Sequence, residues 1–151
     1  MASTDELLNK AKAEAREKQL PYAGALNPEE AYTLLQALPG AKLVDVRTAA
    51  ERDWVGTVPG ALEIEWISYP GGARNEQFAE RLQAEVGDKD TPLLFMCRSG
   101  ARSNAAATLA QQLGYRAVYN VKEGFEGDKD PAGHRGTVGG WRFRGLPWEQ
   151  K

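Results

Sequence analysis

The only cysteine of the chain, Cys97, lies between an apolar run and a segment typical of a helix, in the stretch FMCRSGARSNAA at residues 95–106. Arg98 follows it directly, and Arg102 lies five residues after it. The thiolate is the nucleophilic form of cysteine, and nearby positive charge and backbone amides favour it over the thiol, whose ordinary pKa is about 8.5. Gly100 permits a tight turn that brings backbone amides together. These residue types and spacings predict an activated cysteine in an anion-binding loop.

An inert cysteine at the end of a core strand is the alternative, and most free cysteines are of that kind. Such a cysteine gains nothing from two flanking arginines, whose charges are costly to bury without partners. We therefore favour the functional interpretation of Cys97.

Short apolar segments alternate with helical patterns along the chain. Parallel strands need crossover connections and bury both faces of their sheet, so this alternation predicts an α/β fold of three layers, with a mostly parallel sheet and helices on both faces. Cys97 would then lie at the carboxyl edge of the sheet, where ligands bind in such folds. The expected helices are 3–19, 28–38, a turn beginning at Thr48, 75–86 and 102–113, and the expected strands lie within 41–46, 58–66, 92–97 and 117–120.

Composition limits the classes of function. The hydrophobic share of 42% and the charged share of 26% predict one globular domain, and 19 basic residues scattered among 21 acidic ones, for a net charge of -2, argue against a nucleic-acid partner. No run of 18 apolar residues and no leader-like segment occurs in the sequence, so we expect neither a membrane segment nor export. A lone cysteine cannot form an internal disulfide and fits a reducing, cytoplasmic location.

The cysteine stretch resembles the active-site loop of the rhodanese family of sulfurtransferases, whose pattern is C-R-x-G-x-[RT]. The segment LVDVRTAAERDWVGTVPGALEIEW is similar to the family's D-V-R, E and G-H-I-P-G-A elements, and the resemblance covers about 22–127 and the GLPW tail. Thr57 stands where the family usually has histidine, which we expect to affect packing more than chemistry, and Glu123 replaces a glycine. The matching upstream residues are Asp45, Val46, Arg47, Glu51, Gly56, Pro59, Gly60 and Ala61.

The resemblance implies a five-stranded domain and a persulfide cycle. Cys97 would take the outer sulfur of thiosulfate or a similar small anionic donor and pass it to a thiophilic acceptor such as cyanide or a thiol, without metal or organic cofactor. It also implies a helical extension at 1–21 before a rhodanese-like domain at 22–151, which carries a Gly/Asp-rich loop at 123–140. The implied substrate-binding residues are Arg98, Ser99, Gly100, Ala101, Arg102 and Ser103.

Two other functions stay open. The chain could be a sulfur-carrying or non-catalytic binding module that docks on a partner protein through its extension or long loop. A cysteine-dependent phosphatase of similar fold is a minor alternative, because those enzymes resemble C-x5-R, whereas four residues separate Cys97 from Arg102.

Other candidate residues have structural interpretations. Arg47 and Glu51 have i, i+4 spacing, which predicts a structural ion pair at the start of a helix. Trp66 or Phe125 could border the substrate entrance.

The loop 126–140 contains further polar residues. Asp128 and Asp130 resemble the start of a calcium loop, but the positions that follow do not continue the pattern, and we expect no metal site. His134, the only histidine, is expected to be solvated.

Overall fold

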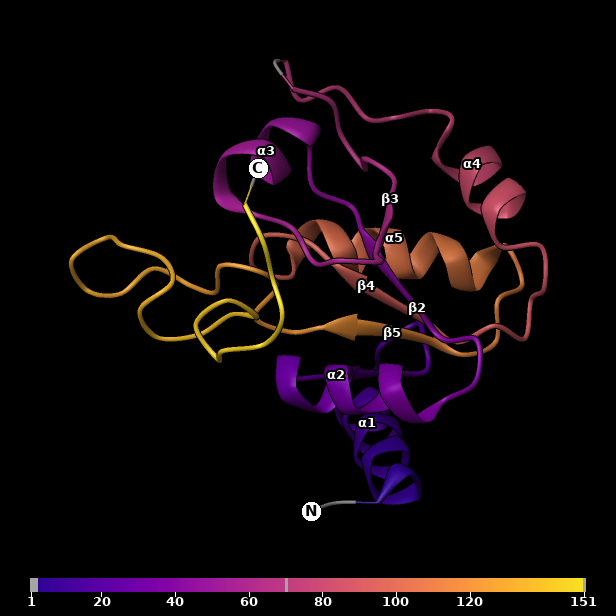
Figure 1. Ribbon diagram of the computed structural model, residues 1–151. Helices are drawn as coiled ribbons and strands as arrows, with labels where there is room; N and C mark the ends of the chain where they lie inside the picture. Colours follow the sequence, from indigo (N-terminus) through magenta and orange to yellow (C-terminus); the bar gives the residue numbers. More distant parts are fainter. Residues whose placement is uncertain (1–2, 70, 151) are drawn as a thin grey trace.

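The computed structural model describes residues 3–69 and 71–150, and its strands and helices alternate along most of this length (Figure 1). Residues 1 and 2 of the predicted extension and residues 70 and 151 of the predicted domain fall outside the described residues. The elements are α1 Thr4–Lys18, β1 Gly24–Leu26, α2 Pro28–Ala37, β2 Lys42–Asp45, α3 Ala49–Val55, β3 Leu62–Glu63, α4 Phe78–Glu85, β4 Leu93–Met96, α5 Ala101–Gln112 and β5 Val118–Val121.

The strands form one sheet in the order β1-β5-β4-β2-β3, and every strand pair in the described chain is parallel. The predicted α/β class with a mostly parallel sheet is confirmed. The chain leaves β2 toward β3 at one edge and leaves β4 toward β5 on the other side. The connections therefore diverge between the carboxyl ends of β2 and β4, the place where open α/β sheets bind ligands.

Side chains of β4 alternate between the two faces of the sheet. Leu93, Phe95 and Cys97 belong to one buried cluster, and Leu94 and Met96 to the other. Figure 1 shows α1 and α2 below the sheet and α4 and α5 on its other side. The predicted three layers are therefore present, and the alternation directs Cys97 to the face covered by α5.

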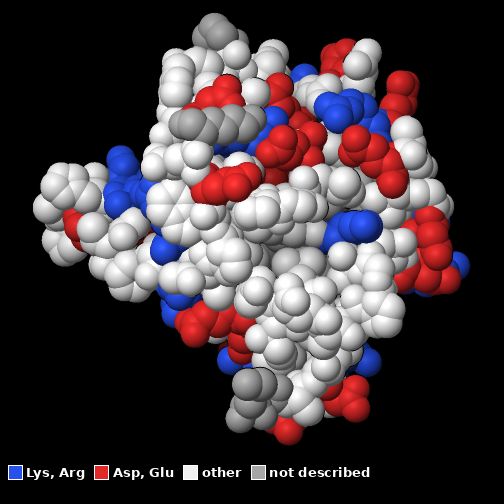
Figure 2. Space-filling model, in the orientation of Figure 1, with Lys and Arg blue, Asp and Glu red and all other residues white. Residues whose placement is uncertain are grey.

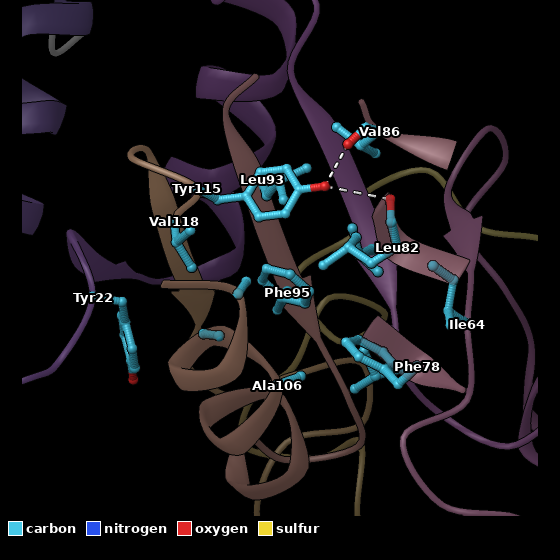
Figure 3. Close-up of a cluster of buried hydrophobic side chains, with 14 of the residues drawn as sticks. Tyr22, Ile64, Phe78, Leu82, Val86, Leu93, Phe95, Ala106, Tyr115 and Val118 are labelled. Carbon is cyan, nitrogen blue, oxygen red and sulfur yellow. Dashed lines mark hydrogen bonds between the residues drawn. The ribbon is translucent and has the colours of Figure 1, made fainter. Parts of the chain in front are cut away.

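Aromatic rings fill much of the cluster on the α4 and α5 side (Figure 3). The rings of Phe78 and Phe95 lie 6.5 Å apart between centroids. The buried Tyr115 hydroxyl donates to the carbonyls of Leu82, at 3.5 Å, and Val86. These bonds satisfy a polar group inside the core and attach the end of α4 to the segment that leads into β5.

Most helix boundaries follow the predicted capping residues. The side chains of Ser3, Asn27 and Thr48 each accept a backbone hydrogen bond at the start of α1, α2 and α3. Helix α4 begins at Phe78, later than the expected residue 75, because the Asn75 side chain binds the turn before it.

Strand β1 was not predicted from the sequence, and it packs closely on α1. A Cβ atom at Gly24 would lie 2.5 Å from the carbonyl oxygen of Ala11, so only glycine lets the helix approach this strand. The described part of the predicted extension, residues 3–21, is thus packed onto the sheet. The division of the chain at residue 21 stays a prediction.

The segment 123–140 extends from the sheet as a lobe after β5 (Figure 1). The chain returns at Trp141, whose amide donates to the Gly124 carbonyl at 2.8 Å and whose ring is fully buried. The C-terminal tail then pairs Glu149 with Thr57 in an antiparallel bridge. The Thr57 hydroxyl donates to the Glu63 carboxylate at 3.0 Å, and the expectation that this residue affects packing more than chemistry stays a prediction.

The surface carries both signs of charge. On the face shown in Figure 2, basic and acidic side chains are interspersed. Over the described residues, the structure contains no helix with the length and apolar character needed to cross a membrane.

Candidate active site

Cys97 lies immediately after β4, and its side chain is only 1% exposed. Its Sγ lies 3.1 Å from the Gly100 amide, which donates to it, and 3.4 Å from the Ser103 hydroxyl oxygen. Apolar residues of the core surround the rest of the thiol. The sulfur is therefore at the boundary between the core and a polar loop.

The backbone of this loop is oriented by the segment after β5. The carbonyl of Cys97 accepts from the Phe125 amide at 2.8 Å, and the carbonyl of Arg98 accepts from Glu126 at 3.0 Å and Gly127 at 3.2 Å. In a trans peptide the N–H points away from the carbonyl before it. The amides of Arg98 and Ser99 therefore point away from residues 125–127 and, within the described chain, bind no backbone acceptor.

Two glycines make this geometry possible. Gly100 is the N-cap residue of α5, with φ +114. Gly124 has φ +66, and a Cβ atom there would lie 2.5 Å from the Cys97 carbonyl oxygen. Both positions require the left-handed conformation that glycine adopts at low cost.

The first turn of α5 adds further amides. Those of Ala101, Arg102 and Ser103 have no backbone acceptor among the described residues. Unpaired N–H groups and the helix dipole make such a terminus favourable for an anion. Together with the Gly100 amide, this turn provides a set of donors beside Sγ.

Ser103 and Asn120 connect the cysteine to β5. The Ser103 hydroxyl lies 2.6 Å from the Asn120 Oδ1 atom, and the Asn120 Nδ2 group donates to the Gly100 carbonyl at 3.3 Å. The hydroxyl has one proton and three acceptors within reach, which are Asn120 Oδ1, the Gly100 carbonyl at 3.1 Å and the sulfur. When it donates to either oxygen, a lone pair is left for the thiol S–H. Sequence reasoning missed Asn120, because its role depends on β4 and β5 being neighbours.

Arg102 forms an ion pair that was not predicted. Its guanidinium donates to both carboxylate oxygens of Glu51, at 2.6 and 2.8 Å. Burial acts to raise the pKa of Glu51, but hydrogen bonds from Arg102 and Thr48 outweigh it and lower that pKa to about 2. The same hydrogen bond raises the pKa of Arg102. Arg102 thus links α3 to the cysteine loop, with its charge neutralised by Glu51.

The predicted ion pair of Arg47 with Glu51 was wrong. Arg47 is fully buried and pairs with Asp45 at 2.7 Å, donates to the Gly56 carbonyl and lies over the ring of Phe125 at 4.2 Å. Arg47 therefore has the structural role expected for it, but with Asp45 as its partner.

Arg98 is the exposed arginine of the loop, and its side chain forms no hydrogen bond or ion pair within the described chain. It borders a hollow of about 350 Å3 between α3, residues 67–69 and 72, and the cysteine loop. The side chains that define the hollow include Trp54, Val55, Ile67, Tyr69, Arg98 and Arg102.

Neither residue expected to border the substrate entrance lines this hollow. Phe125 is fully buried beneath the loop, and Trp66 packs edge-on against Phe78 with centroids 5.0 Å apart. Trp54 and Tyr69 line the hollow instead. Trp54 lies three residues after Glu51 on the same helix. This spacing indicates that Trp54 is close to the site only once Glu51 is known to bind Arg102.

A second hollow, of about 580 Å3, flanks the other side of the loop and touches Ser99, Gly100 and Ala101. Its polar side chains are largely paired with one another. The Tyr22 hydroxyl donates to Asn104 at 2.5 Å.

The remaining candidates are structural. The carboxylate of Asp130 accepts from the amides of Ala132 and His134 and from the Thr137 hydroxyl at 2.6 Å, so it closes the turn of the lobe. No cluster of three or more potential metal ligands occurs in residues 3–69 and 71–150.

Comparison with known proteins gives consistent matches. The profile of the rhodanese-like domain family matches residues 27–130. A crystal structure of Rv0390 from M. tuberculosis superposes with a TM-score of 0.79 and 40% identity, covering 86% of this chain and 99% of that one.

Two sequence relatives extend the comparison. The uncharacterized protein RP600 of Rickettsia prowazekii is 34% identical over 121 residues, which are 80% of this chain and 92% of the relative. The thiosulfate sulfurtransferase GlpE of Tolumonas auensis is 31% identical over 110 residues, which are 73% of this chain and 92% of the relative. A polysulfide-sulfur transferase homodimer from Wolinella succinogenes, at 21% identity and a TM-score of 0.61, shares the fold.

Proposed function

Because the chain belongs to the rhodanese-like domain family, whose model matches most of its length, we propose that it is a sulfurtransferase that carries sulfur as a persulfide on Cys97. The observation that carries the proposal is the contact of Sγ with the Gly100 amide, at the centre of a loop whose other amides bind no backbone acceptor within the described chain. Such donors stabilise negative charge on sulfur in both the thiolate and the persulfide.

The donor proposed is thiosulfate or a similar small anion. The Cys97 thiolate attacks the outer sulfur of thiosulfate, the S–S bond of thiosulfate breaks, and its electron pair leaves with sulfite. The product is Cys97–S–S⁻, so one S–S bond replaces another and no external oxidant or reductant is required. This matches the activity named for the GlpE relative.

The two arginines have different roles in this proposal. Arg98 is exposed and unpaired within the described chain, so it attracts and orients the sulfonate. Arg102 is neutralised by Glu51 and fixes the position of the loop. The amides from Arg98 to Ser103, with Ser99, Gly100 and Ala101 between them, hold the sulfur that is transferred.

The second step passes the outer sulfur to a nucleophile. Cyanide attacks that sulfur to give thiocyanate, and the electron pair returns to Sγ as a thiolate. A thiolate acceptor reacts in the same way and leaves with the sulfur. Cys97 must be a free thiol or thiolate at one stage of this cycle, which fits a reducing compartment, and we propose a cytoplasmic location.

The test is the intact mass of the protein after treatment with thiosulfate and then cyanide. We expect one added sulfur that cyanide removes, together with thiosulfate:cyanide sulfur transfer that Cys97→Ala abolishes. The circular dichroism spectrum of this variant should match that of the wild type, because a small buried side chain replaces another. Unchanged turnover in Cys97→Ala would refute the assignment.

Phosphatase activity without a persulfide would favour the phosphatase alternative. A wild type without persulfide that still binds a partner would favour the docking module.

A further inference from the structure

The hollow beside Arg98 is larger than the proposed donor and cyanide require. Ligand pockets in proteins typically measure about 300–1,000 Å3, so its volume of about 350 Å3 is suited to a small organic molecule. It lies at the divergence of the β2 and β4 connections, where α3 and the start of α5 face each other through the Glu51–Arg102 pair.

Two aromatic side chains form its outer wall. Trp54 is 70% exposed and Tyr69 is 61% exposed, and their rings lie edge to face with centroids 6.1 Å apart. Trp54 belongs to α3 and Tyr69 to the connection between β3 and α4, and most of their surface is left open to solvent. Exposed aromatic surface along the wall of a hollow is typical of a binding site.

The hollow has one uncompensated charge. The charges of Arg102 and Glu51 cancel across their bidentate contact, whereas Arg98 has no partner within the described chain. Val55 and Ile67 add apolar surface to the lining, and Thr48 and Ser68 add neutral hydroxyl groups. A ligand that matches these aromatic side chains and this single positive charge needs an apolar, preferably planar body and one anionic group.

We propose that this hollow binds the sulfur acceptor, and that the acceptor is a small organic thiol with an aromatic or other planar apolar body and an anionic group. The anionic group pairs with Arg98, and the body lies against Trp54 and Tyr69. This inference depends on the proposed persulfide function of Cys97.

The transfer is balanced within the two reactants. The acceptor thiolate attacks the outer sulfur of Cys97–S–S⁻ and forms a new S–S bond. The bond between Sγ and the outer sulfur breaks, and its electron pair stays on Sγ. The acceptor leaves as a persulfide anion, and the enzyme returns to the thiolate.

The experiment uses 4-mercaptobenzoate as an aromatic anionic thiol, mercaptoacetate as an anionic thiol without a ring, and cyanide as a small acceptor. Protein that already carries the added sulfur on Cys97 is mixed with each acceptor, and the loss of that sulfur is followed by intact mass. For each variant the rate constant for 4-mercaptobenzoate is divided by those for mercaptoacetate and cyanide, which removes differences in protein concentration and in the extent of charging.

In Trp54→Ala and Tyr69→Ala we expect both ratios to fall about tenfold, because one aromatic contact with the acceptor is lost. Trp54→Phe should restore most of the ratio, since it keeps a ring. Phe143→Ala is the matched control, because Phe143 is exposed to a similar degree but does not line the hollow.

Ratios that stay within about twofold of the wild type in both alanine variants would overturn the inference. That outcome is distinct from failure of the proposed function, in which the wild-type protein would acquire no sulfur from thiosulfate at all.

Discussion

The ion pair between Glu51 and Arg102 is the contact that connects α3 to the cysteine loop, and Glu51→Gln tests its contribution. Glutamine has nearly the same shape as glutamate, and it can still accept the Thr48 amide as the third residue of a capping box. The substitution therefore removes the negative charge opposite Arg102 and leaves the start of α3 in place. It also leaves Arg102 half-buried without a counter-charge.

The magnitude follows from the pKa of Glu51. A decrease from 4.5 to about 2 corresponds to about 3.5 kcal/mol at roughly 1.4 kcal/mol per pKa unit. The side chains of Arg102 and Glu51 are 19% and 22% exposed, and solvent screening reduces the expected loss of unfolding free energy to roughly 1–2 kcal/mol. The raised pKa of Arg102 reports the same pair and is not added to this value.

The pH dependence has a defined sign. Folding lowers the pKa of Glu51, so the stabilisation is complete above pH 4.5 and is lost as the pH falls toward 2. The difference in unfolding free energy between wild type and Glu51→Gln should therefore be largest near neutral pH and decrease in acid.

Urea unfolding at about pH 7, 4 and 3 measures this difference, provided that both proteins unfold in two states. Glu76→Gln is the matched control, because Glu76 is exposed and forms no ion pair within the described chain. A difference that is equal at all three pH values, or a loss as small as that of the control, would contradict the role given to the pair.

Further predictions concern the two arginines and the glycine under the loop. Arg98→Ala should raise the KM for thiosulfate about tenfold with little change in the free energy of unfolding. Arg102→Ala should instead lower the free energy of unfolding by roughly 1–2 kcal/mol. Steady-state kinetics and urea unfolding measure the two effects, and the reverse pattern would refute the roles given to the two arginines. Gly124→Ala should cost roughly 2–4 kcal/mol, because its Cβ atom would lie 2.5 Å from the Cys97 carbonyl oxygen at φ +66. In thermal or urea unfolding, Gly145→Ala is the control at φ +74, with no atom within 4 Å of its Cβ position, and an equal loss in both variants would exclude the close contact as the cause.

Local patterns were sufficient to predict much of the fold. Capping residues and apolar periodicity are short-range signals, and they indicated the helices that Ser3, Asn27 and Thr48 begin. The apolar run that leads to Cys97 indicated a buried strand, and β4 ends at Met96, one residue before the cysteine. Strand β1 has three residues and is defined by its pairing with β5, so the sequence around it contains too short a pattern to identify.

The error at Arg47 shows where a local rule stops applying. The i, i+4 rule requires both residues to be helical, but Thr48 is the N-cap of α3, so Arg47 precedes the helix and its side chain follows the extended backbone after β2. From there it enters the core and pairs with Asp45. Glu51, inside the helix, is then available to Arg102, which lies 51 residues later in the sequence.

This long-range pairing changes how the two arginines beside the cysteine are interpreted. Their spacing alone suggests that both arginines add positive charge to the loop, because the sequence does not show whether either one has an acidic partner. In the folded chain the charge of Arg102 is offset by Glu51 at 2.6 Å, so the loop gains its uncompensated charge from Arg98 and its anion-binding capacity from backbone amides. An electrostatic field built from amides does not depend on flexible side chains, because residues 125–127 fix the carbonyls of Cys97 and Arg98 and so orient the amides that follow. Substituting Arg102 should therefore affect the stability of the loop before it affects the chemistry of the sulfur.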